Sequence, residues 1–116
     1  MSFLALMVMM AATPPAFVEK PCADPALSRI ARCGSVEVPE NRSRPGGRRI
    51  ALNLIILNAA SASPDLPPAF DIDGGPGLAV TKNAGFYATD GAAYRARREI
   101  VMVDQRGSGG SNPLAC

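Results

Sequence analysis

The sequence predicts an α/β fold in which an antiparallel hairpin leads into a mostly parallel sheet. Two observations carry this prediction. Residues 69–73 alternate apolar and polar side chains and then break into glycines, whereas residues 100–103 form a continuous apolar run that ends abruptly in charge and glycine. An unbroken apolar strand is typical of sheets that helices cover on both faces. Residues 78–99 between the two runs are long enough for the helical crossover that joins parallel strands.

Residues 1–16 are predicted to be a signal peptide. An uncharged apolar run over residues 1–12 is followed by small residues and prolines. It is too short for a membrane-spanning helix, which needs about 20 apolar residues, but it suits the apolar region of a secretory signal. No basic residue precedes the run, so an ordinary N-terminal segment, or a start upstream of Met1, stays an alternative. We expect a secreted or periplasmic protein without stable membrane insertion.

The three cysteines are Cys22, Cys33 and Cys116. Cys22 and Cys33 flank a short polar stretch with a proline, which can close as a disulfide-bonded loop in an oxidising compartment, and Cys116 is then left over. The chain has no histidine and no Cys-x-x-Cys spacing. Histidine and paired cysteines are the usual ligands of structural zinc, so we expect no metal site. We also expect no cofactor.

The first predicted strands form a hairpin. Residues 33–38 alternate, residues 41–47 are rich in turn formers, and residues 49–57 return as an extended apolar strand. Residues 59–68, rich in serine, alanine and proline, are expected to form a surface connection to the strand at residue 69. In the crossover, residues 78–86 can form about two helical turns and residues 89–96 a short helix, while Gly85 and Gly91 argue against one long helix.

Composition and charge are those of one globular domain, assigned to residues 17–116. Hydrophobic residues make up 47% and charged residues 19% of the chain, and the formal net charge is +2. The arginines cluster around the hairpin turn and before residue 100, but no aromatic residues interleave with them. We therefore expect solvated charge and no nucleic-acid partner.

Each of the two later strands is followed by a glycine-rich loop. The first loop places Gly74, Gly75 and Gly77 around Pro76. Glycines adopt positive φ and allow close approach to the backbone, so such a loop can point bare N–H groups outward. An ordinary tight turn is the alternative, since glycine and proline dominate turns. The second loop reads Asp-Gln-Arg-Gly-Ser-Gly-Gly-Ser over residues 104–111.

Together, the two motifs resemble the α/β-hydrolase fold, and more narrowly the prolyl aminopeptidase and tripeptidyl aminopeptidase group of serine peptidases. Two positions depart from the group. Asp73 stands where a histidine usually precedes Gly-Gly-Pro-Gly, and Gly110 stands where many members carry arginine. The resemblance implies the N-terminal part of a hydrolase that releases N-terminal residues or tripeptides from a peptide substrate.

In the fold that the chain resembles, the loop after the third strand gives one backbone N–H to the oxyanion hole. This maps to Gly75 first and Gly74 second, because Pro76 has no N–H to donate. The residues expected to support the two loops are Asp73, Pro76, Gly77, Asp104 and Arg106. We expect Asp104 and Arg106 to act through a local ion pair.

The other catalytic parts are missing from these 116 residues. There is no Gly-x-Ser-x-Gly and no histidine, so a Ser-His-Asp triad cannot form, and Ser108 and Ser111 are interpreted as loop formers. We therefore expect an incomplete hydrolase domain that is inactive and poorly folded on its own. Nucleotide binding is disfavoured, because Asn112 occupies a glycine position of the dinucleotide fingerprint. The alternative function is a small secreted binding or structural module without catalysis, stapled by the disulfide.

Overall fold

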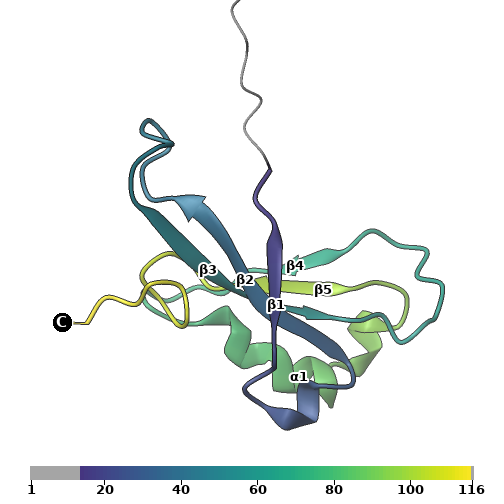
Figure 1. The fold of residues 1–116 in the computed structure, drawn as a ribbon. Coiled ribbons are helices and arrows are strands. Elements are labelled where there is room, and N and C mark those ends of the chain that lie inside the picture. The colour runs from purple at the N-terminus through teal and green to yellow at the C-terminus, as the bar shows by residue number, and fades with distance from the viewer. Residues whose placement is uncertain (1–13, 116) are drawn as a thin grey trace, which may run out of the picture.

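The computed structural model describes residues 14–115, which form one five-stranded sheet with a few short helices (Figure 1). The strand order is β1-β2-β3-β5-β4. The strands are β1 (Phe17–Lys20), β2 (Ala31–Pro39), β3 (Arg49–Leu57), β4 (Ala69–Asp71) and β5 (Ile100–Val103). Most of the predicted signal peptide lies outside the described residues, as does Cys116.

The sheet contains both parallel and antiparallel strand pairs. β4 and β5 are parallel, as expected for the two strands that precede the glycine loops, but the other three pairs are antiparallel. The α/β class is therefore confirmed, whereas the prediction of a mostly parallel sheet is wrong for the described part of the chain. The reason is that β3 pairs antiparallel with β5 and β1 adds a further antiparallel edge.

The predicted hairpin is confirmed as β2 and β3, with Ser35 opposite Asn53 in the register. Strand β1 was not predicted, because its four mostly exposed residues lack a clear apolar alternation. Its pairing with β2 brings the backbone very close at Gly34, where an added Cβ would lie 2.2 Å from the Val18 carbonyl oxygen. Glycine at position 34 thus allows β1 to pair with β2 at the edge of the sheet.

The core lies on one face of the sheet. Neighbouring strands contribute the aligned residues Ala31, Leu57 and Ile100, and Met102 follows on the same face of β5. Leu57 and Met102 are fully buried. The helices pack on this face (Figure 1), so the expected coverage of both faces is not found in residues 14–115. On the opposite face Phe70 is 66% exposed.

Three short helices form the crossover between β4 and β5. They are the 3₁₀ helix η2 (Val80–Asn83), the α-helix α1 (Ala84–Ala88) and the 3₁₀ helix η3 (Ala92–Arg95). Gly91 separates α1 from η3, as expected, and donates its N–H to the Phe86 carbonyl at 2.8 Å. An added Cβ at Gly91 would lie 2.4 Å from the Phe86 ring, so a side chain does not fit there.

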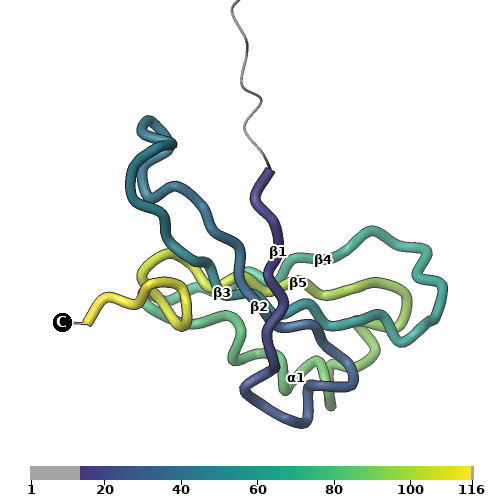
Figure 2. Tube along the Cα trace, in the orientation of Figure 1, coloured from purple at the N-terminus to yellow at the C-terminus, as the bar shows by residue number. Residues whose placement is uncertain are grey.

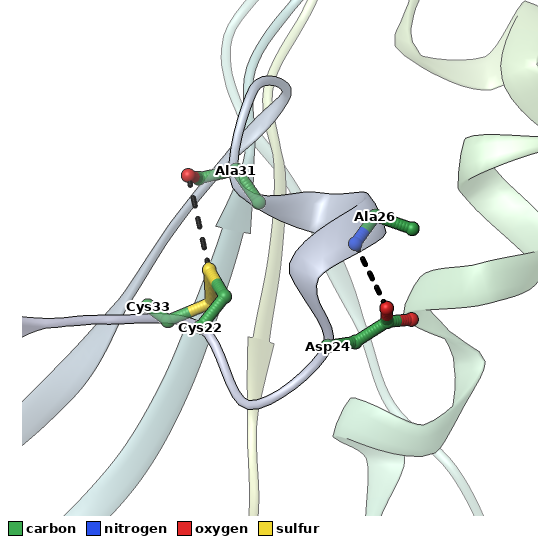
Figure 3. The surroundings of a disulfide bond; sticks show 5 residues. All are labelled: Cys22, Asp24, Ala26, Ala31 and Cys33. Atoms are coloured by element: carbon green, nitrogen blue, oxygen red, sulfur yellow. Dashed lines mark hydrogen bonds between the residues drawn. A yellow bond between two sulfur atoms is a disulfide. The ribbon is translucent and has the colours of Figure 1, made fainter.

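The predicted disulfide between Cys22 and Cys33 is present (Figure 3). It closes a strap between β1 and β2 that contains the 3₁₀ helix η1 (Pro25–Leu27), where the Asp24 side chain accepts a hydrogen bond from Ala26 N–H at 2.9 Å. Leu27 of the strap enters the core. Within residues 14–115, no helix has the length and hydrophobicity needed to cross a membrane.

Candidate functional site

The two glycine-rich loops lie next to each other because β4 and β5 are adjacent and parallel, with Asp71 opposite Met102. Both loops leave the carboxyl ends of their strands, which is where open α/β sheets bind ligands. A cavity of about 220 Å³ lies between the loops. Its lining residues are Asp71, Ile72, Asp73, Leu78, Val80, Val103 and Gln105.

The first loop is a turn closed by a hydrogen bond from Leu78 N–H to the Gly75 carbonyl at 3.2 Å. Pro76 and Gly77 are its central residues, and Gly77 has a φ of +83°. Proline followed by a residue with positive φ is the pattern of a type II turn. Gly75 itself has a φ of +85°, and an added Cβ there would lie 2.9 Å from Leu78 Cδ1. Both glycines are thus required by the backbone.

The N–H groups of the first loop differ in their partners. Gly74 donates to Oδ1 of Asp73 at 2.8 Å. For Gly75 N–H, residues 14–115 provide no hydrogen-bond acceptor. The Gly75 N–H is therefore available to a ligand, whereas the Gly74 N–H is already engaged. The role of either glycine in an oxyanion hole stays a prediction.

Two carboxylates precede these glycines on the same side of the chain. Asn83 Nδ2 donates to Asp71 Oδ2 at 3.1 Å and to Asp73 Oδ2 at 3.3 Å. Asp71 also lies near the Tyr87 phenol, and burial, followed by the negative charge of Asp71, raises the pKa of Tyr87. Tyr87 is therefore a neutral phenol at physiological pH.

Asp104 anchors the second loop and is fully buried. Its carboxylate accepts hydrogen bonds from Asn53 Nδ2 at 2.9 Å and Gly110 N–H at 3.0 Å. Thr81 donates twice, from its N–H at 3.1 Å and its hydroxyl at 3.0 Å. Burial acts to raise the pKa of Asp104, but these hydrogen bonds outweigh burial and hold the pKa below the ordinary value for aspartate. Asp104 is therefore a charged, fully hydrogen-bonded support.

The expected ion pair between Asp104 and Arg106 is wrong. Asp104 points inward to its four donors, and Arg106 instead donates to the Glu40 carbonyl oxygen at 2.7 Å. Arg106 thus ties the second loop to the turn end of the β2–β3 hairpin. Both residues support the loop, but through separate contacts.

The serines of the second loop also support its shape. Ser111 is fully buried, and its hydroxyl accepts a hydrogen bond from Asn53 N–H at 2.7 Å. Ser108 donates its hydroxyl to the Gln105 carbonyl oxygen at 2.9 Å. These contacts agree with the interpretation of both serines as loop formers. An added Cβ at Gly110 would lie 2.8 Å from the Asn53 side chain, which accounts for glycine at this position.

Comparison with models of known protein families gave no match, and comparison with curated proteins gave no significant one. Within the described residues, no group of three or more histidine, cysteine, aspartate or glutamate side chains is placed to hold a metal ion. The absence of a metal or cofactor in the functional protein stays a prediction.

Sequence reasoning missed three residues that hold the loops in place: Asn53, Thr81 and Asn83. Asn53 carried a usable signal, because it is the one polar residue in the apolar run 50–57. A polar side chain inside a buried strand needs a hydrogen-bond partner, and here the partner is Asp104. Thr81 and Asn83 carried no such signal, since polar residues are ordinary in a short, half-exposed helix.

Proposed function

We propose that the chain is the N-terminal part of a secreted or periplasmic α/β-hydrolase, a serine peptidase of the aminopeptidase type. In this proposal, Gly75 N–H is one donor of the oxyanion hole. The observation that carries it is a backbone N–H without a protein acceptor, held in a glycine turn between the ends of two adjacent parallel strands.

The proposed chemistry is acyl transfer. When a nucleophile attacks a peptide carbonyl, negative charge develops on the carbonyl oxygen, and a preorganised N–H stabilises that charge. The turn around Pro76 is suited to this task, because proline restricts its φ and a hydrogen bond from Leu78 N–H to the Gly75 carbonyl closes it. The nucleophile, the general base and the orienting acid belong to residues outside these 116, which contain no histidine.

Two further observations support the proposal. The parallel pairing of β4 and β5 brings the Gly-Gly-Pro-Gly and Asp-Gln-Arg-Gly motifs to one edge of the sheet, as the resemblance to aminopeptidases implies. The Cys22–Cys33 disulfide is typical of oxidising compartments, which favours export. The choice of N-terminal residues or tripeptides as leaving products rests on the sequence resemblance alone.

The test is the substitution Gly75→Val in the protein expressed from the whole reading frame. Chromogenic substrates with an N-terminal proline or tripeptide report on activity. Valine keeps the N–H, but a side chain is strained at a φ of +85° and its Cβ would lie 2.9 Å from Leu78 Cδ1, so the N–H is displaced. An oxyanion donor acts mainly in the transition state, so we expect kcat to fall about 10²-fold or more while KM changes only a few-fold.

The matched control is Gly46→Val, in the β2–β3 turn, where an added Cβ meets no atom within 4 Å. It is expected to leave kcat unchanged. An unchanged kcat in Gly75→Val contradicts the role of Gly75. Absence of any peptidase activity in the wild-type product favours the non-catalytic secreted module instead.

A further inference from the structure

We propose that Asn83 is the positioning residue of the glycine loop, holding the peptide units before Gly75 in place through Asp73. The inference rests on the proposed function only in calling this loop part of an oxyanion hole. The hydrogen bonds themselves, and the test below, are independent of catalysis.

The amide of Asn83 bridges two carboxylates. Its Nδ2 lies 3.1 Å from Asp71 Oδ2 and 3.3 Å from Asp73 Oδ2, so the two hydrogens of one NH₂ group serve both acids. Asp71 and Asp73 are two residues apart in an extended segment and share one side of it. Without a donor between them, their like charges repel each other, which favours movement of the more exposed Asp73 into solvent.

The second carboxylate oxygen of Asp73 links Asn83 to the glycine loop. Asp73 Oδ1 accepts from Gly74 N–H at 2.8 Å, so the carboxylate is held on one side by Asn83 and holds Gly74 on the other. The peptide unit that follows Gly74 contains the Gly75 N–H. The orientation of this N–H therefore depends on Asn83, which acts through Asp73 and, within the described residues, does not hydrogen-bond to the glycine loop's N–H groups itself.

Asn83 is itself fixed by the second loop. It is the last residue of η2, and Thr81 of the same 3₁₀ helix donates two hydrogen bonds to the buried Asp104. Figure 2 shows this start of the crossover beside the C-terminal loop. One short helix thus connects the carboxylate at the end of β5 to the glycine loop at the end of β4.

The test uses an isosteric change, Asn83→Asp, which keeps the shape of the side chain, removes its donor and adds a third negative charge. The readout is amide hydrogen exchange at Gly74, followed by NMR, in the isotope-labelled protein expressed from the whole reading frame. Because one hydrogen bond is lost, we expect Gly74 to exchange up to about tenfold faster. The Gly74 amide resonance is also expected to shift.

The matched control is Asn41→Asp. Within residues 14–115, the side chain of Asn41 bonds only through its Oδ1, which accepts from Ser43 N–H at 2.9 Å, and aspartate keeps that acceptor. This control is expected to leave Gly74 exchange as in the wild type. The amides of the β2–β3 ladder report in the same spectra that the sheet is intact.

An unchanged exchange rate at Gly74 in Asn83→Asp overturns the proposal, because it shows that the amide of Asn83 does not hold the Gly74 N–H in place. Equal acceleration in Asn41→Asp overturns it too. If Asn83→Asp also accelerates the β2–β3 amides, Asn83→Ala decides, since it removes the donor without adding charge. Faster exchange confined to residues 73–77 then supports the proposal, and wild-type exchange there refutes it. Neither outcome depends on whether Gly75→Val changes kcat.

Discussion

The Asp104 carboxylate accepts four hydrogen bonds from three parts of the chain: strand β3, helix η2 and its own loop. All its donors are neutral, and it is fully buried. A buried charge is tolerated only when its hydrogen-bonding capacity is used, and here both oxygens have donors. Gly109 leaves room for this carboxylate, because an added Cβ at this residue would lie 2.3 Å from Asp104 Oδ2.

Asp104→Asn is expected to lower the free energy of unfolding by about 2 kcal/mol or more. The substitution replaces one acceptor oxygen with an NH₂ donor. Whichever oxygen is replaced, the new donor faces an N–H that has lost its acceptor. Urea unfolding of the chain measures the change. Asp90→Asn, at an exposed position, is the matched control and is expected to have little effect; equal losses in both variants would show that Asp104 has no special role.

The pH dependence of stability follows from the same carboxylate. Because the pKa of Asp104 is lowered in the folded state, its contribution to stability is complete above the ordinary aspartate pKa. The contribution is lost as pH falls toward the lowered pKa. We therefore expect the wild type to lose more stability than Asp104→Asn between about pH 5 and pH 2. Parallel stability profiles of the two proteins would contradict this account.

At the scale of elements, the strap between β1 and β2 depends on the disulfide. The sulfurs of Cys22 and Cys33 join the ends of the strap, where Leu27 is buried in the core cluster and Cys22 and Ile30 pack against it partly buried. The other residues of the strap are exposed, so the disulfide is a main constraint on its position.

Replacing both Cys22 and Cys33 by serine is expected to cost about 2 to 3 kcal/mol of unfolding free energy, following the chain-entropy model for a loop of this size. Cys116→Ser is the control and is expected to leave stability unchanged. Mass spectrometry of non-reduced peptides from the exported protein identifies the bond. Free thiols at both positions, or a bond from either to Cys116, would show that the pairing is wrong.

The elements could be predicted where the signal was local. Hairpin β2–β3 was found from alternation and turn residues, and the glycine loops after β4 and β5 from abrupt changes in composition. Strand β1 could not be found, because its extended state comes from pairing with β2. The inward direction of Asp104 was also missed, since Arg106 is a local partner whereas Asn53 lies 51 residues earlier in the chain. Long-range hydrogen bonds leave no periodic trace in a sequence.

At the scale of the whole molecule, the two faces of the sheet differ. Short helices and the strap pack on one face, while Phe70 is exposed on the other. All-parallel sheets are covered on both faces, whereas antiparallel sheets can leave one face in water, and this sheet contains one parallel pair next to three antiparallel ones. The proposal accordingly expects that elements encoded after Cys116 pack on the open face, next to the candidate site.

The coding sequence beyond the Cys116 codon, read in all frames, tests the central claim most directly. If the chain is the N-terminal part of a serine hydrolase, the continuation encodes a Gly-x-Ser-x-Gly nucleophile motif, followed by an aspartate or glutamate and then a histidine. These residues would complete the triad that residues 1–116 lack. A reading frame that closes with no such motif in any frame would contradict the hydrolase assignment and favour the small disulfide-stapled module.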